Sequence, residues 1–246
     1  MRVADFLEFL DHEGRLLAAA AAAAGPGADV PPCPGWRVRD LVRHLGAVHR
    51  WAAALVADRA AEAPPLGDPP EPADDELVSW YRDSHRLVLD TLAAAPADLE
   101  CWTFHTAPNP SPLAFWARRQ AHETAVHRYD AESARGGEPS PIDRDFAVDG
   151  IDELLRGFHA REHSRLRSER PRVLRVRAVD AGPDAVWTVR LTAGPAMTVR
   201  AVEGEAEAEL SGPADRLYLA LWNRTAVPRV TGDPALAALW RERSGI

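Results

Sequence analysis

The spacing of hydrophobic and polar positions divides the chain into a helical part and a part with strands. In the first 168 residues, apolar side chains recur with the 3.6-residue period of helices that bury one face. Segments rich in proline and glycine interrupt this pattern, as expected for connections between helices. The pattern predicts helices over residues 3–24, 37–61, 74–95, 112–134 and 143–168.

From about residue 171 the period changes to two, which is typical of half-buried strands. Turn signals separate the strands, and two short helices are expected near the end of the chain. The strands are predicted over 173–179, 185–191, 197–202 and 206–210, and the helices over 214–224 and 235–243. The sequence therefore predicts an α+β protein with two domains. Residues 1–168 are expected to form a helical bundle, and residues 171–246 a small α+β domain with an antiparallel sheet.

The helix predicted over 112–134 has no clean apolar stripe, because charged residues occur nearly all round it. Its large apolar side chains, among them Phe115, Trp116 and Val126, nevertheless need burial. Some polar side chains must then face inward with them. An inward carboxylate such as Glu123 requires a partner, either an arginine or a metal ion, because a buried unpaired charge is costly. A solvated, charged helix is the alternative.

Glu123 and His127 lie one helical turn apart and can converge on a single ion. His122 lies about 140° away from His127 around the helix and cannot easily share that ion. His44 belongs to the buried stripe of the helix over 37–61, and facing helices of a bundle can bring inward ligands together. His44, Glu123 and His127 would make a His₂Glu set, which is usual for catalytic zinc and also suits iron, nickel or manganese. An ordinary core position for His44 is the alternative.

Other polar residues carry weaker signals. Arg119 and Asp130 share the helix face of Glu123 and His127, so they either orient the metal ligands or form surface ion pairs. His49 is expected to face outward. His159 and His163 are one turn apart but are expected on an exposed, arginine-rich face.

The composition excludes several classes of protein. A net charge of −8 without a basic run argues against a nucleic-acid partner. All 29 basic residues are arginines, which excludes lysine Schiff-base chemistry. Cys33 and Cys101 lie far apart and are expected to be reduced thiols. The first turns carry acids, unlike a signal peptide, and the alanine run 18–24 is too short to span a bilayer. A cytoplasmic protein without a membrane partner is expected.

Three segments carry a resemblance to a known family: CPGWRVRDLVRHLGAVHRW (33–51), WARRQAHETAVHRYDAE (116–132) and DGIDELL (149–155). Together they resemble the mycothiol-dependent maleylpyruvate isomerase family, and the resemblance covers almost the whole chain. It implies a DinB-like four-helix bundle, with metal ligands at His44, Glu123 and His127. It also implies a C-terminal domain similar to sterol-carrier proteins.

The resemblance further implies an enzyme that uses mycothiol, a low-molecular-weight thiol, together with a divalent metal. The metal is expected to be Zn²⁺, with Ni²⁺ or Fe²⁺ as alternatives. The expected reaction is isomerisation of a small electrophile or transfer of the thiol to it, by a monomer or homodimer. Arg224 is the nearest match to a C-terminal arginine that binds substrate carboxylates, and Arg216 and Arg229 are rivals. The alternatives are a non-catalytic, metal-stabilised binding protein and a metal-dependent hydrolase that needs no thiol.

Overall fold

The computed structural model describes residues 1–67, 70–104 and 111–245. Their contacts divide the chain into two compact units that meet in sequence between Ser140 and Pro141. The first unit is helical and the second combines helices with one sheet, so the α+β prediction is confirmed. Among the residues described, no helix is long and apolar enough to cross a membrane.

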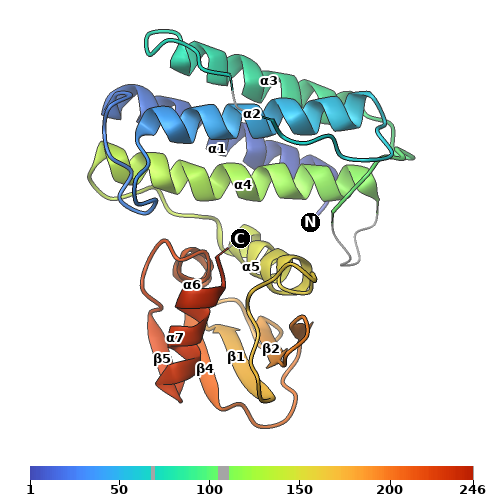
Figure 1. The fold of residues 1–246 in the computed structure, drawn as a ribbon, viewed down its shortest axis with the longest axis vertical. Helices are drawn as coiled ribbons and strands as arrows, with labels where there is room; N and C mark the ends of the chain where they lie inside the picture. Colours follow the sequence, from blue (N-terminus) through green and yellow to red (C-terminus); the bar gives the residue numbers. More distant parts are fainter. Residues whose placement is uncertain (68–69, 105–110, 246) are drawn as a thin grey trace. The chain divides into compact units, whose positions relative to one another are not determined.

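Four helices that run side by side build the N-terminal unit (Figure 1). They are α1 (Val3–Ala24), α2 (Val38–Ala57), α3 (Leu77–Ala94) and α4 (Pro112–Arg135). Both α1 and α2 pack against α3 and α4, which encloses an apolar core. The first and fourth helices match their predicted bounds to within one residue. The second ends four residues early, because the chain turns at Arg59, whose φ is +47°.

Helices α2 and α3 approach closely at one glycine. Gly46 on α2 faces the indole ring of Trp80 on α3, and a methyl group at this glycine would overlap that ring. Leu41 and Leu45 of α2 pack beside this contact with Tyr81 of α3, and all three are fully buried. The close approach holds α2 in place, and α2 carries His44.

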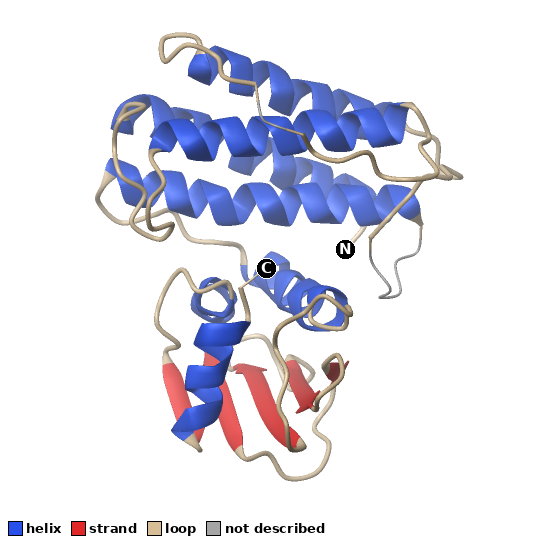
Figure 2. Ribbon diagram, viewed as in Figure 1, coloured by secondary structure: helices blue, strands red, loops and turns tan. Residues whose placement is uncertain are grey.

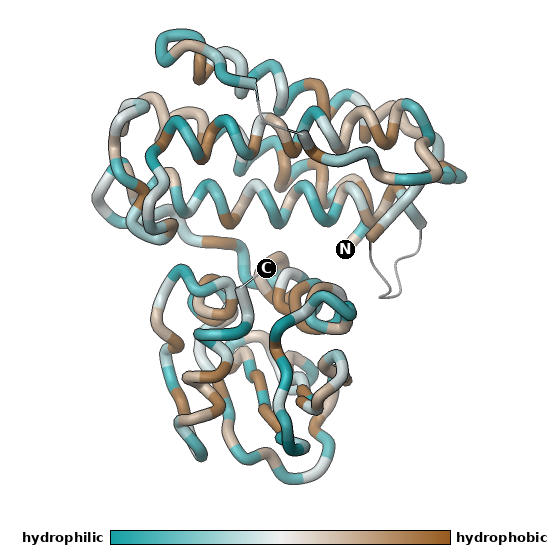
Figure 3. Tube along the Cα trace, viewed as in Figure 1, coloured by the Kyte–Doolittle hydropathy of each residue, from teal (hydrophilic) through white to brown (hydrophobic). Residues whose placement is uncertain are grey.

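Helix α4 buries many polar side chains, as its irregular apolar pattern predicts. It begins as expected, because Ser111 Oγ accepts a hydrogen bond from the backbone N–H of Ala114 and Pro112 follows the cap. Hydrophilic positions recur along the whole helix (Figure 3). The buried polar residues of α4 are Arg118, Arg119, Gln120, His122, Thr124, His127, Arg128, Asp130 and Glu132. The alternative of a solvated, charged helix is therefore wrong.

The C-terminal unit holds one five-stranded sheet with three α-helices and a π-helical segment (Figure 2). The elements are α5 (Arg144–Glu153), η1 (Leu154–Phe158), β1 (Arg172–Ala178), β2 (Val186–Leu191), β3 (Met197–Val199), β4 (Ala208–Gly212), α6 (Ala214–Leu221), β5 (Arg229–Gly232) and α7 (Pro234–Arg243). The strand order is β3-β2-β1-β4-β5. All pairs are antiparallel except β1 with β4, which is parallel.

Three features of this unit differ from the sequence-based expectation. The fifth helix was expected to reach residue 168, but its helical structure ends at Phe158. This helix packs against α6, so the structure divides the chain before α5 instead of near residue 168. His159, expected on an exposed basic face, is buried with its ring 5.0 Å from that of Trp240. The strand β5 has four exposed residues and therefore lacks the alternation by which strands are predicted.

Candidate metal centre

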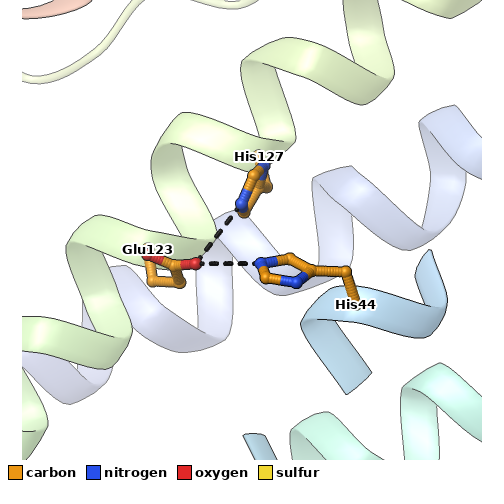
Figure 4. A group of neighbouring side chains, drawn as sticks. All are labelled: His44, Glu123 and His127. Carbon is orange, nitrogen blue, oxygen red and sulfur yellow. Dashed lines mark hydrogen bonds and ion pairs between the residues drawn. The ribbon is translucent and has the colours of Figure 1, made fainter. Parts of the chain in front are cut away.

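Three side chains from two helices converge in the N-terminal unit. Glu123 and His127 project from α4 and His44 from α2 (Figure 4). Glu123 Oε1 lies 3.4 Å from His44 Nε2 and 3.3 Å from His127 Nε2. One potential ligand atom from each residue lies within 4.8 Å of the other two. The structure therefore brings together all three residues that the sequence suggests as ligands.

The spacing of these atoms fits a metal ion. Two ligands about 2.1 Å from a tetrahedral ion lie about 3.4 Å apart, which agrees with both measured separations to a carboxylate oxygen. Two imidazole nitrogens and one carboxylate oxygen are a donor set of catalytic zinc, and they also suit iron or nickel. The side chains of His44 and Glu123 are 32% and 21% exposed, so solvent reaches one side of the cluster. A further ligand can enter from that side.

Two buried side chains orient the candidate ligands on α4. Arg119 Nη2 donates a hydrogen bond to Glu123 Oε2 at 2.9 Å, which leaves Oε1 to face the histidines. His127 Nδ1 donates to Asp130 Oδ2 at 2.9 Å, so Nε2 is the ring nitrogen that faces Glu123 in the cluster. A carboxylate on the far nitrogen of a metal-binding histidine is a recurrent arrangement. Arg119 and Asp130 are both buried, which excludes the surface ion pairs considered from the sequence.

The electrostatics of the cluster favour a charged pair when no metal is bound. Burial lowers the pKa of His127, but hydrogen bonds to the carboxylates of Asp130 and Glu123 outweigh this effect and raise it to about 9. Burial raises the pKa of Glu123, yet hydrogen bonds to the two histidines and the charge of Arg119 hold it well below its usual value. His127 is therefore protonated at neutral pH when the cluster holds no cation.

Metal uptake is expected to release about one proton per chain at pH 7, because binding through Nε2 requires neutral His127. The affinity should rise about tenfold per pH unit between pH 6 and 8 and level off above pH 9. Calorimetric zinc titrations in buffers of different ionisation enthalpy measure the proton count. Asp130→Asn, which removes one carboxylate beside His127, is the control and should release fewer protons. An equal count in both proteins would contradict this assignment.

Residues just before α2 also reach the cluster, and sequence reasoning assigned them no role. The ring of Trp36 lies 5.2 Å from that of His44 and stacks on that of His127 at 6.2 Å. Cys33 Sγ donates to Asp130 Oδ2 at 3.3 Å. Both belong to the segment CPGW, residues 33–36, and its match to the family motif was the only signal available. This segment forms one wall of the site.

Two other histidines of the bundle, His122 and His49, lie outside the cluster. His122 packs its ring on Phe6, in agreement with its predicted separation from His127. His49 was expected to face outward, but it is fully buried and its Nε2 pairs with Thr124 Oγ1 at 2.9 Å. Burial and neighbouring histidines lower the pKa of His49 far below its usual value, so it is neutral at physiological pH.

Arg224 lies in the C-terminal unit, just after α6. Its Nη1 donates to the carbonyl of Trp222 at 2.9 Å, and the residue is half-buried. The rivals Arg216 and Arg229 are both exposed. The role of Arg224 toward a substrate stays a prediction.

The matching family models and the similar solved structures indicate the same family. Residues 7–132 match the family model for the mycothiol maleylpyruvate isomerase N-terminal domain, and residues 145–239 match the MDMPI C-terminal domain model. A crystal structure of the mycothiol-dependent maleylpyruvate isomerase has a TM-score of 0.60 at 14% identity, and covers 94% of this chain and 92% of its own. A mutant of that enzyme has a TM-score of 0.61 at 13% identity, with coverages of 92% and 91%. The comparison with curated proteins gives no match.

Proposed function

The chain belongs to the mycothiol maleylpyruvate isomerase family, and from this membership we propose a metal-dependent enzyme that uses mycothiol. Its substrate would be a small electrophile, and its reaction an isomerisation or a transfer of the thiol. The observation that carries the proposal is the convergence of His44, Glu123 and His127, with the carboxylate oxygen 3.4 and 3.3 Å from the two imidazole nitrogens. Both separations are compatible with a tetrahedral ion. The partial exposure of His44 and Glu123 would give a thiol access to the ion.

His44, Glu123 and His127 would hold the ion, Zn²⁺ being the first expectation. When bound, the ion would favour the deprotonated, nucleophilic form of a thiol, because a nearby cation lowers the thiol pKa. Arg119 keeps one carboxylate oxygen of Glu123 turned toward the histidines. Asp130 fixes the proton of His127 on Nδ1 and so presents Nε2 to the ion. These two residues position the ligands and prevent their rotation.

The thiolate would attack an electron-poor carbon of the substrate. For a cis double bond, addition makes a single bond that can rotate, and expulsion of the thiolate regenerates the double bond as trans. For a substrate with a leaving group, the new C–S bond stays and the leaving group departs with its electron pair. We propose Arg224 as the cation that binds a substrate carboxylate, since its forked guanidinium suits that group.

The test is the dependence of turnover on the thiol. Protein with its metal is assayed with maleylpyruvate and with 1-chloro-2,4-dinitrobenzene, in the presence and absence of mycothiol. We expect turnover of at least one substrate only when mycothiol is present. Equal turnover without thiol would favour a hydrolase with a metal-activated water. Metal binding without turnover of either substrate would favour a non-catalytic binding protein.

A further inference from the structure

The C-terminal unit carries a concave surface that encloses a volume of about 800 Å³. The proposed thiol chemistry does not use the residues that line it. It lies between the segment 164–172, the turn after β2 and one face of α7. Five of its eleven lining residues are arginines, against 29 arginines in the 246 residues of the chain. The arginine-rich composition of the protein therefore does not account for this concentration. We call this surface the arginine groove; its arginines are Arg165, Arg167, Arg170, Arg172 and Arg243.

Backbone carbonyls hold two of these arginines in place. Arg167 donates to the carbonyls of Ser164, Ala193 and Glu162 at 2.5 to 3.0 Å. Arg165 donates to the carbonyl of Gly245 at 3.3 Å. A neutral carbonyl orients a guanidinium group without cancelling its charge. Among the described residues, Arg167 forms an ion pair with Glu162, whose carboxylate lies 3.4 Å away and is 81% exposed, so it compensates the charge weakly.

The remaining arginines differ in how their charge is balanced. Arg172 is buried and pairs with the carboxylates of Glu207 and Asp233, so it braces the floor of the groove without excess charge. Arg170 and Arg243 are exposed. The charge of Arg170 acts on Asp233 and contributes to lowering the pKa of that carboxyl, after the hydrogen bonds from Ala235 and Arg172. Glu169 is the single carboxylate in the lining. The arginine groove therefore holds excess positive charge in a protein whose net charge is −8.

The groove also has an apolar side. Ala235 and Leu239 are one helical turn apart on α7, and Ala193 contributes from the turn after β2. If these arginines only kept a basic surface solvated, the surface would need neither a hollow nor an apolar side. It would also not need arginines held by hydrogen bonds to backbone carbonyls. The volume lies within the range of small-molecule sites, about 300–1,000 Å³.

From this arrangement we propose that the arginine groove binds a small organic anion with two or more carboxylate or phosphate groups. Guanidinium forks pair with either group through two parallel hydrogen bonds, and the apolar side accommodates a hydrocarbon body. None of the lining residues belongs to the His44, Glu123 and His127 cluster. The proposal is therefore independent of the thiol chemistry.

The test measures binding of two probe anions, tricarballylate and pyrophosphate, to the full chain by calorimetry at low ionic strength. We expect a dissociation constant below about 1 mM for at least one probe, weakening as salt is added. Arg165→Glu/Arg170→Glu should weaken binding at least about tenfold. Arg190→Glu/Arg200→Glu is the matched control, because it makes the same change of charge in the same unit outside the groove. It should change the affinity less than about twofold.

Equal weakening in both double variants would overturn the proposal, since it would show a response to net charge alone. The proposal would also be overturned if the wild-type protein bound neither probe at about 10 mM, roughly the weak limit of specific recognition. Binding of only one probe supports the groove and identifies the ligand as a polycarboxylate or a phosphate compound. Circular dichroism tests whether the variants are folded. If Arg165→Glu/Arg170→Glu is not folded, the single exposed change Arg170→Ala replaces it.

Discussion

Replacement of Glu123 or His127 by alanine is expected to abolish metal binding. The thiol-dependent activity should then fall at least about a hundredfold. Loss of a residue that only orients a ligand typically costs about 10- to 100-fold in affinity, so loss of a ligand should cost more. Each change leaves only two of the three converging donor atoms. The measurement is elemental analysis of protein purified without added metal, followed by the mycothiol assay.

His122→Ala is the matched control for the metal experiment. This residue lies on the same helix and is also buried, but its ring packs on Phe6 and not in the cluster. It should retain about one metal ion per chain. A full complement of metal in both Glu123→Ala and His127→Ala would show that the ion binds elsewhere. A wild-type protein that takes up no zinc, nickel or iron would reduce the cluster to a buried polar network.

Replacement of Arg128 by methionine is expected to destabilise the helical unit by about 3–5 kcal/mol. It leaves Glu13 buried without its cation, and it leaves Glu132 with only Arg135, at 3.8 Å. Arg128 is fully buried, and its guanidinium binds Glu13 at 2.6 Å and Glu132 at 2.8 Å. It also donates to the carbonyl of Ser140 at 2.5 Å. Differential scanning calorimetry should show a midpoint lower by roughly 10 °C. The deficit should shrink at lower pH, because burial raises the pKa of Glu13 and protonation removes its charge.

The control for this network is Arg15→Met, which removes an exposed arginine that pairs with Asp11 on the outside of α1. Exposed pairs contribute about 0–1 kcal/mol, so the midpoint should barely move. In the Arg128→Met background, Glu13→Gln should recover part of the lost stability by removing one buried charge. A wild-type midpoint in Arg128→Met would contradict the role of this ion-pair network.

Sequence periodicity located the helices of the bundle well, because each buries one face against its neighbours. It failed where contacts between distant residues decide the structure. The helix expected to reach residue 168 ends at Phe158. The next residue, His159, is instead buried against Trp240, far away in the sequence. The strand β5 forms only because β4 offers it a partner. The parallel pairing of β1 with β4 likewise leaves no trace in local alternation.

The candidate site divides in the same way. Helical spacing alone placed Glu123 and His127 on one face and separated His122 from them, because neighbours on a helix follow from its geometry. His44 required the apolar stripe of its helix together with the family resemblance, since nothing local ties residue 44 to residue 123. Neither signal revealed that Trp36 and Cys33 reach the same cluster. Whether the cluster holds a metal stays a prediction.

The sequence by itself determined the α+β class, most helix bounds, the family and the need for inward polar groups on α4. These properties follow from the hydrophobic period, the composition and the motifs, all of which can be read from residues that are close together in the sequence. Helical spacing already offered Arg119 and Asp130 as neighbours of Glu123 and His127, and the structure pairs them. Only the tertiary structure decided the partner of Arg128, which is Glu13 on α1. It also gathered the arginines of the arginine groove from separate segments. The reason is physical, because a buried charge needs a partner and only the packing of whole elements selects which residue supplies it.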